Sequence, residues 1–239
     1  MEYIALMFDA PLQSWGFSSR FQRRATGLHP TKSGVVGLLC AALGAAKGSA
    51  EEAEWLPKLS ALRMTVVTIP RKATSEFAGA PEEENPVRCL EDFHTVLDTR
   101  RATGTMNSDP VVTRRQYLLD ARFGVLLAGS LQVLAPLAEA VRNPVWGVWF
   151  GRKSCLPAGP LYRAGPCDEA GAWRALIGDQ ERKRFTRVEE VDRFEDGQDS
   201  INDQPLSFGN ADSSGPEGRQ FAPRRISVIL KSDRENHKP

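Results

Sequence analysis

The sequence has few of the residues that bind metal ions or form disulfides. Its 239 residues include four cysteines and three histidines. The cysteines are widely spaced and form no CxxC pair: Cys40, Cys89, Cys155 and Cys167. A disulfide framework or a zinc knuckle would need closer pairing. We therefore expect reduced thiols in a cytoplasmic protein that has neither a metal site nor a cofactor.

Long hydrophobic runs and a strong net charge are also missing. No apolar run approaches the ~20 residues that span a bilayer. The first ten residues carry an acid, Glu2, where a secretory signal would be basic, so we expect neither a signal peptide nor contact with a membrane. The 31 basic and 30 acidic residues leave a net charge of +1. This balance excludes binding of nucleic acid by overall charge and leaves a local groove as the alternative.

The common catalytic motifs HExxH, GxSxG, GxGxxG and GxxxxGK[ST] do not occur in the sequence. One enzymatic alternative is left open. His94, Tyr117 and either Lys72 or Lys153 are residue types that metal-independent RNA cleavage uses, because a general base must activate a 2′-hydroxyl. We favour the other interpretation, in which His94 makes a local hydrogen bond or contacts a partner.

The stretch Pro30–Gly44, PTKSGVVGLLCAALG, predicts a buried helix that is entered through Ser33 and ends at Gly44. Gly34 and Gly37 each cost such a helix about 1 kcal/mol relative to alanine. Close approach of a strand or a ligand would justify that cost. The N–H groups of a first helical turn lack intrahelical partners, and the helix dipole favours negative charge there. The stretch is therefore a candidate anion-binding site.

A basic loop, residues 17–29, precedes this helix and carries Arg20, Arg23 and Arg24. Arginine suits bidentate phosphate contact, although a solvated surface loop is the alternative interpretation. Just before the loop, Gln13 supplies hydrogen-bonding capacity and Trp15 supplies a wide aromatic face. Trp15 either closes the core, which we favour, or stacks on bases.

Two further stretches carry basic residues. Residues 71–116 read as a long hairpin with extended arms around a tip, TRRATGTMNSDP, and acids partly offset its arginines: Arg88, Arg100, Arg101, Arg114 and Arg115. The turn GRKSC, Gly151–Cys155, follows an expected strand. Its Arg152 and Lys153 make it a second candidate phosphate-binding site.

The remaining pattern predicts a mixed α+β fold. We expect strands at Tyr3–Phe8, Leu62–Ile69, Arg122–Ala128, Trp146–Phe150 and Ile226–Leu230, and helices at Ala50–Ser60, Leu134–Val141 and Glu169–Ile177. Residues 196–223 are rich in Asp, Gly, Ser, Asn and Pro and read as a long loop.

Without the hairpin, the first part has the order βαββαβ, which is the ferredoxin-like arrangement and the scaffold of RNA-recognition modules. We divide the chain into a ferredoxin-like (RRM-like) palm at 1–150, with a hairpin thumb inserted at about 71–116, and a smaller, irregular, β-rich region at 151–239.

Six blocks resemble, in this order along the chain, the CasD family of subunits of the type I-E CRISPR Cascade complex: APLQSWG, RRATGLHPTKSGVVGLL, DFHTVL, TRRQYLLDARFGVLL, FGRKSC and RQFAPR. The resemblance implies a non-catalytic RNA-binding subunit that caps the 5′ handle of the CRISPR RNA. Such a subunit contacts the backbone and large subunits, and it meets target DNA indirectly, through guide pairing.

With the resemblance added, the expected RNA contacts are Gln13, Trp15, Arg20, Arg23, Arg24, Lys32, Ser33, Gly34, Gly37, Arg100, Arg101, Arg114, Arg115, Arg152 and Lys153. Two other functions stay open. In the related type I-C branch the equivalent subunit cuts precursor CRISPR RNA, which here would use His94, Tyr117 and Lys153. A scaffold that binds only protein is the third possibility.

Overall fold

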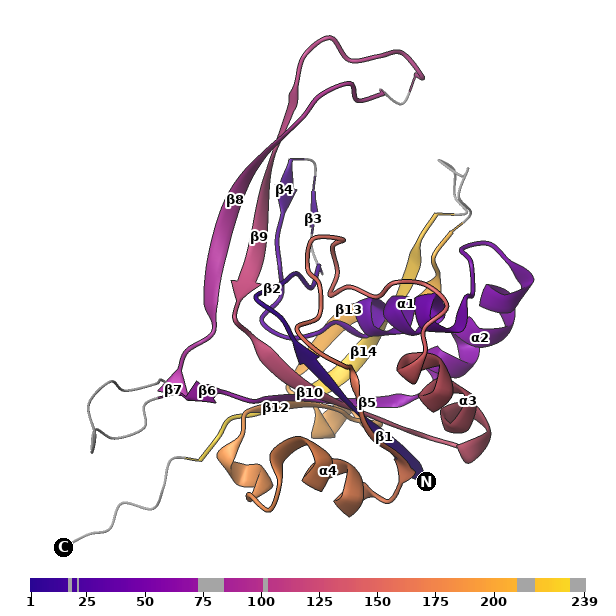
Figure 1. The fold of residues 1–239 in the computed structure, drawn as a ribbon, viewed down its shortest axis with the longest axis vertical. Helices are drawn as coiled ribbons and strands as arrows, with labels where there is room; N and C mark the ends of the chain where they lie inside the picture. The colour runs from indigo at the N-terminus through magenta and orange to yellow at the C-terminus, as the bar shows by residue number, and fades with distance from the viewer. Residues whose placement is uncertain (17–18, 21, 73–83, 101–102, 210–217, 233–239) are drawn as a thin grey trace, which may run out of the picture.

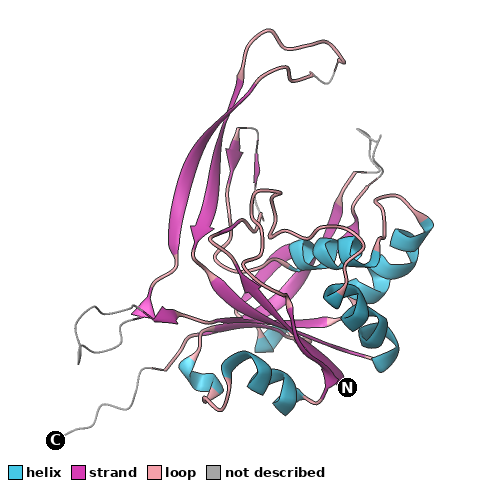
Figure 2. Ribbon diagram, viewed as in Figure 1, coloured by secondary structure: helices cyan, strands magenta, loops and turns pink. Residues whose placement is uncertain are grey.

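The fold is built on one seven-stranded antiparallel sheet with helices on both faces (Figures 1 and 2). The structure is a computed structural model that describes residues 1–16, 19–20, 22–72, 84–100, 103–209 and 218–232. The sheet has the order β11-β1-β10-β5-β12-β14-β13. Its strands are β1 (Glu2–Asp9), β5 (Arg63–Thr68), β10 (Arg122–Gly129), β11 (Tyr162–Cys167), β12 (Arg187–Glu190), β13 (Asp199–Ser207) and β14 (Gln220–Ile229).

The central strand β1 is buried on both faces because alternate side chains enter different cores. Ile4, Leu6 and Phe8 pack in the larger cluster, on the face that carries α1 (Lys32–Leu43), α2 (Ala50–Ser60) and α3 (Leu131–Arg142). Ala5 and Met7 pack in the smaller cluster with α4 (Glu169–Ile177). Helices on opposite faces explain why the sequence of β1 is a continuous apolar run.

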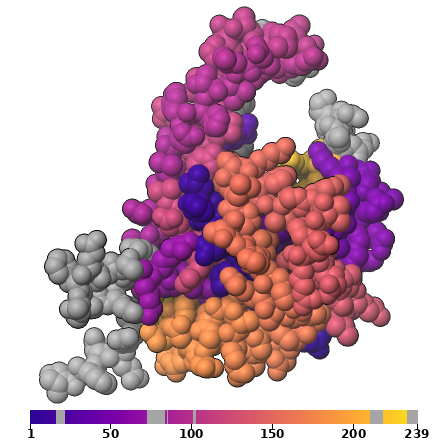
Figure 3. All heavy atoms as spheres, viewed as in Figure 1, coloured from indigo at the N-terminus to yellow at the C-terminus, as the bar shows by residue number. Residues whose placement is uncertain are grey.

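A second sheet carries a long hairpin that stands out from the body (Figures 1 and 3). Its arms, β8 (Arg88–Val96) and β9 (Val111–Leu119), pair antiparallel along their whole length. The other edge of β9 pairs with β2 (Leu12–Gln13) and, in parallel, with β4 (Arg23–Arg24). The short strand β3 (Ser19–Arg20) pairs with β4, and β6 (Arg71–Lys72) pairs with β7 (Glu84–Asn85) near the hairpin base.

Two of the expected elements differ from the structure. Trp146–Phe150 is a loop, and the strand that pairs with the outer edge of β1 is β11, which Gly165 and Pro166 hide from a propensity-based prediction. The described part of residues 196–223 contains the strand β13 and the start of β14, where a long loop was expected; residues 210–217 lie outside the described residues. Between α4 and β13, two 3₁₀ turns, η1 (Arg182–Arg184) and η2 (Phe194–Asp196), stand on either side of β12.

The N-cap of α1 lies two residues before the position that the sequence predicts. Thr31, and not Ser33, is the N-cap of α1, and its hydroxyl accepts a hydrogen bond from the Gly34 N–H. Gly44 ends the helix as expected, in the left-handed conformation with φ of 74°. The bounds predicted for α2 and α4 agree with the structure.

A buried ionic cluster joins α1 to the C-terminal strands. Lys32 is 2% exposed, and its Nζ donates to both carboxylate oxygens of Glu190, at 2.8 and 2.9 Å. Arg224, whose side chain is 2% exposed, donates from Nε and Nη2 to Asp203, at 2.9 and 2.8 Å. The cluster holds two charges of each sign, so its burial is electrostatically balanced.

Within the described residues, no helix is both long and apolar enough to cross a bilayer. The same residues contain no group of three His, Cys, Asp or Glu side chains arranged as metal ligands.

We predict that Lys32→Ala lowers the free energy of unfolding by about 3–5 kcal/mol, because it leaves the buried cluster with two carboxylates and one cation, Arg224, whose Nη1 lies 3.8 Å from Glu190. Lys58→Ala is the matched control. Lys58 pairs with Glu54 at 2.6 Å, but its side chain is 43% exposed, and we expect a loss below about 0.5 kcal/mol. Urea unfolding of both variants measures the difference; equal losses would contradict a structural role for Lys32.

Candidate nucleic-acid interface

A cleft of about 500 Å³ opens at the start of α1. It has two cationic side chains, Arg24 and Arg219, and two aromatic side chains, Phe208 and Phe221. The remaining lining comes from the start of α1 and from two loops: Thr31, Ser33, Gly34, Ser14, Trp15, Gly16 and Gly151. Cations that neutralise phosphates, beside aromatic rings that stack on bases, are the composition of a single-stranded nucleic-acid site.

The basic loop and the hairpin meet at this cleft. Because β4 pairs with β9, Arg23 lies beside Arg114, and Arg24 lies beside Arg115. Arg23 and Arg114 share one carboxylate, Glu91, at 3.6 and 3.8 Å. Stretches that are about ninety residues apart in the sequence therefore lie side by side. Because side chains alternate along a strand, the pair Arg23–Arg114, which Glu91 partly neutralises, and the pair Arg24–Arg115 lie on opposite faces of these strands.

Arg152 holds this arrangement together from the turn that follows Phe150. Its Nη1 donates to the carbonyl of Gln116 at 3.1 Å, and its Nη2 donates to the carbonyl of Arg24 at 3.0 Å. The guanidinium also lies over the ring of Tyr117, 4.4 Å from its centroid. Arg152 thus joins β9 to β4, and we assign it a positioning role in place of the phosphate contact expected from the sequence.

Gln13 and Trp15 are corrected as RNA contacts, because both belong to the core. Trp15 is 1% exposed and stacks on Phe8 with ring centroids 5.6 Å apart. Its Nε1 donates to the side-chain oxygen of Gln13 at 3.0 Å. Gln13 is fully buried and donates to the carbonyls of Phe8 and Ala121. The favoured interpretation of Trp15, closure of the core, is confirmed.

The anion expected at the first turn of α1 is already supplied by the protein. Asp203, from β13, accepts a hydrogen bond from the Lys32 N–H at 2.8 Å, and the Thr31 hydroxyl accepts one from Gly34. Lys32 is likewise corrected as a phosphate contact: burial lowers the pKa of its ammonium, and Glu190 opposes this by favouring the charged form. Ser33 lines the cleft.

The other predicted contacts lie elsewhere or are not described. Arg100 pairs with Met106 across the hairpin tip and is not among the residues that line the cleft. Arg101 lies outside the described residues, and so does the side chain of Arg20. Lys153 is exposed beside Trp149, with 5.8 Å from its Nζ to the ring centroid.

The residues proposed for RNA cleavage are not brought together. His94 pairs in register with Thr113, and Tyr117 pairs with Leu90, so four residues, or about 13 Å along a strand, separate the two side chains. Tyr117 is 4% exposed and covered by Arg152, whereas the His94 ring lies 3.4 Å from Asp92. His94 is therefore not paired with Tyr117 as a general base.

Sequence reasoning missed Arg219, Phe208 and Phe221 as cleft residues. They lie within residues 196–223, the stretch that its composition marked as a loop: Phe208 follows the end of β13, and Arg219 and Phe221 stand at the start of β14. The available signal was an aromatic residue on each side of a run rich in Asp, Ser and Gly, which is typical of two hairpin arms.

Comparison with known proteins places these features in context. Residues 3–226 match the family described as CRISPR-associated protein (Cas_Cas5). The chain is 31% identical, over 179 residues, to the CRISPR system Cascade subunit CasD of Escherichia coli (strain K12), covering 73% of this chain and 75% of that protein.

Two solved structures share the fold. A chain of a CRISPR RNA-guided surveillance complex superposes with a TM-score of 0.71 at 25% identity, covering 96% of this chain and 90% of that one. A second, from a crystal structure of a Cas protein, has a TM-score of 0.61 at 29% identity, with coverage of 96% and 95%.

The two glycines of α1 face different neighbours, which gives a test of the cleft wall. A Cβ on Gly34 would lie 3.0 Å from the Trp15 ring, whereas a Cβ on Gly37 would have Phe208 at 3.7 Å as its nearest neighbour. We predict that the free energy of unfolding of Gly37→Ala exceeds that of Gly34→Ala by about 1–3 kcal/mol. Only the methyl group of Gly34→Ala would press against the buried Trp15 ring. Thermal unfolding measures this, and equal melting temperatures would contradict the packing.

Proposed function

The chain belongs to the CRISPR-associated Cas5 family, and from this premise we propose that it is a non-catalytic RNA-binding subunit of a type I-E Cascade surveillance complex. In this role it caps the 5′ handle of the CRISPR RNA and contacts the backbone and large subunits of the complex. Target DNA is then recognised by guide pairing, with this subunit acting on it indirectly. Such a subunit works in the cytoplasm.

The single observation that carries the proposal is the cleft at the start of α1. It combines Arg24 and Arg219 with Phe208 and Phe221. The cations match a sugar–phosphate backbone and the rings match unpaired bases, so the composition favours a single-stranded segment over a duplex. A handle that is not paired with target DNA is such a segment.

The arrangement of the elements supports a ferredoxin-like palm with a thumb. The palm strands in chain order are β1, β5, β10 and β11, and in the sheet they follow the order β11-β1-β10-β5. The helix α1 leads from β1 towards β5, and α3 connects β10 to β11. The hairpin β8–β9 enters between β5 and β10, which is where the thumb is expected.

The thumb offers apolar surface for a neighbouring subunit. Leu90, Phe93, Leu97 and Met106 are between 42% and 67% exposed along one arm and the tip. Exposed apolar residues on a projecting hairpin fit a partner that covers them. We assign this surface to the adjacent backbone subunit.

We predict that the double variant Arg24→Gln/Arg219→Gln binds a repeat-derived handle oligonucleotide at least ~10-fold more weakly at 100 mM salt. The slope of log K against log salt should fall by about 1.4, since each single-strand phosphate contributes about 0.7. Fluorescence anisotropy of the labelled oligonucleotide measures both quantities. Wild-type protein that binds no handle RNA would favour the protein-only scaffold.

The control variant is Arg63→Gln/Arg174→Gln, which removes the same charge from two exposed arginines outside the cleft. We expect its affinity to stay within about twofold of wild type, because screening limits the effect of distant surface charges. An equal loss in both double variants would assign the effect to overall charge.

We predict that the full-length protein leaves a repeat RNA intact in the presence of EDTA, because His94 and Tyr117 are separated along the hairpin. Denaturing electrophoresis after incubation measures cleavage. Specific cleavage that disappears in His94→Ala would overturn the non-catalytic assignment and favour the type I-C activity.

A further inference from the structure

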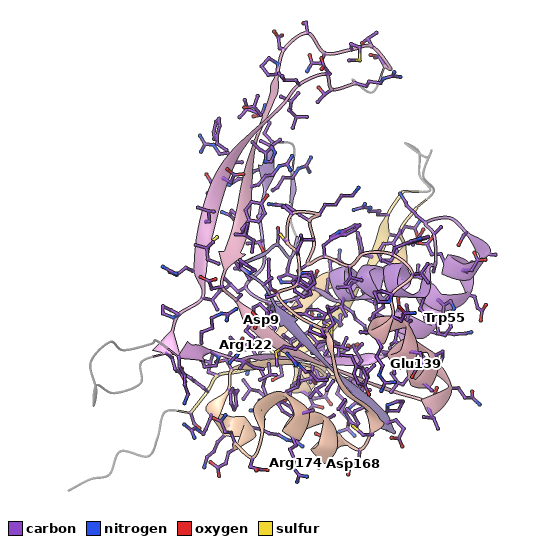
Figure 4. All side chains as sticks on the ribbon, viewed as in Figure 1. Asp9, Trp55, Arg122, Glu139, Asp168 and Arg174 are labelled. Carbon is purple, nitrogen blue, oxygen red and sulfur yellow. The ribbon has the colours of Figure 1, made fainter. Side chains whose placement is uncertain are left out.

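The hairpin strand β8 has one edge that pairs with no described strand. Its inner edge pairs with β9 at every residue, from Arg88 opposite Leu119 to Val96 opposite Val111. Figure 4 shows the hairpin side chains standing clear of the helices, and no described element lies along the outer side of β8. A row of backbone N–H and C=O groups is therefore open on that side.

A hydrogen bond on β9 shows which backbone groups of β8 point outwards. The Arg114 N–H donates to the Gln22 carbonyl at 2.9 Å, on the side of β9 that faces away from β8. Arg114 is opposite Phe93, so these two form a pair whose N–H and C=O groups point away from each other. Because this direction alternates along a strand, the backbone groups of Glu91, Phe93 and Thr95 lie on the open edge.

Several features that usually protect an edge strand are missing from β8. Natural edges are blunted by proline, by lysine or by a bulge. The sequence of β8, RCLEDFHTV, contains neither proline nor lysine, and its register with β9 is unbroken. Its side chains are also accessible: Phe93 is 63% exposed, and Asp92 and His94 are 45% and 47% exposed. Such an edge is a template on which a further strand can pair.

The sequence of β8 is complementary to itself in one antiparallel register. Two copies related by a twofold axis at Phe93 place residues of matching chemistry opposite each other: Phe93 and Phe93, Asp92 and His94, Glu91 and Thr95, Leu90 and Val96. Aromatic and opposite-charge pairs stabilise a sheet, and a neutral imidazole still donates a hydrogen bond to a carboxylate. The axis repeats each pair on its other side, so the whole segment from Leu90 to Val96 fits its own reverse.

The neighbouring registers of the same edge fit less well. An axis at Glu91 or at Asp92 places two carboxylates opposite each other, and like charges in that position destabilise a sheet. An axis at Leu90 engages only the first half of the strand. An axis at His94 places two imidazoles opposite each other and gives Asp92 no polar partner. The charge pattern therefore selects the register centred on Phe93.

We propose that two copies of this protein pair through the outer edges of β8, antiparallel and centred on Phe93, so that two hairpins form one four-stranded sheet. The open N–H and C=O groups of Glu91, Phe93 and Thr95 then bond to those of the second copy. One strand edge is a small interface, so the dimer is weak and reversible. It covers Phe93, which is assigned above to a neighbouring subunit, and it therefore belongs to the free protein and dissociates on assembly.

Sedimentation equilibrium of the full-length protein, between about 5 and about 500 µM, tests the dimer over the range suited to a small interface. We expect a reversible monomer–dimer equilibrium whose dissociation constant rises at least ~10-fold in Phe93→Lys, because two like charges then meet on the axis. The matched control is Met106→Lys at the hairpin tip, where Met106 is 54% exposed, and it should stay within about twofold of wild type. A protein that is monomeric throughout, or an equal effect of both variants, overturns the proposal.

A mixing experiment tests the register. In the proposed dimer, Asp92→Lys turns both Asp–His pairs into pairs of two bases, and His94→Asp turns them into pairs of two acids. An equal mixture of the two variants keeps one Asp–His pair and gains one pair of lysine with aspartate. We expect the mixture to associate at least ~5-fold more tightly than either variant alone. Any change within a single chain is the same in both measurements, so the absence of a gain on mixing overturns the register.

Amide hydrogen exchange separates strand pairing from contact between side chains. Strand pairing protects alternate amides, those of Glu91, Phe93 and Thr95, because the amides of Asp92 and His94 already point towards β9. We expect the first three to exchange about fivefold more slowly at the highest protein concentration than at the lowest. Exchange that does not depend on concentration overturns the proposal.

The same measurement identifies another occupant of the edge. If Glu91, Phe93 and Thr95 become protected only when the adjacent backbone subunit is added, the edge belongs to that subunit and the dimer is overturned. Arg24→Gln/Arg219→Gln should dimerise like wild type, because neither arginine lies on β8. The proposal therefore stands or falls independently of RNA binding in the cleft.

Discussion

The buried ionic cluster at the start of α1 is the interaction on which the rest of the structure depends. Asp203, from β13, accepts hydrogen bonds from the Lys32 N–H and from two nitrogens of Arg224. Glu190, from β12, holds the Lys32 ammonium and also accepts the Met64 N–H at 3.1 Å. The N-terminus of α1, the strand β5 and the strands β12, β13 and β14 are thus fixed to one another. Removing any one of these groups would leave a buried charge or a buried polar group without its partner. The N-terminal turn of the helix takes its negative charge from the fold itself.

This arrangement explains how a cleft forms from segments that are distant in the chain. Arg24 comes from the loop that pairs with the hairpin, Gly34 from α1, and Phe221 from β14. Arg152 fixes the first of these through the Arg24 carbonyl, and the ionic cluster fixes the last through β13 and β14. A shared carboxylate, Asp203, therefore links the helix to the strands that carry the aromatic wall. The position of the aromatic wall is therefore set by contacts outside the cleft, and the side chains of Arg24 and Arg219 do not take part in them.

The sequence alone predicts those helices and strands whose bounds depend on residues close by in the chain. The bounds predicted for α2 and α4 agree with the structure, and the caps that fix their starts, Ser49 and Asp168, are local to the sequence. The hairpin was predicted from two extended stretches on either side of a tip rich in Gly, Asn, Ser and Asp, and its arms are β8 and β9. Where long-range pairing decides, the same reasoning failed. The strand β13 is polar in sequence because Asp203 is needed inside as a partner for Arg224, and β11 contains Gly165 and Pro166 because it is an edge strand. Lys32 looked like a surface cation since its acidic partner lies 158 residues away.

A net charge of +1 conceals a strongly uneven distribution of charge. Ion pairs inside the protein neutralise many of the charges, as Lys32, Glu190, Asp203 and Arg224 do at the start of α1. Where cationic side chains have no acid beside them in the lining, as at the cleft, a local potential remains that composition cannot reveal. The alternation along β1 that builds two cores also sends Phe8 and Asp9 to opposite faces of the main sheet. The period of a single strand thus gives the sheet one face that packs against α1, α2 and α3 and another that packs against α4.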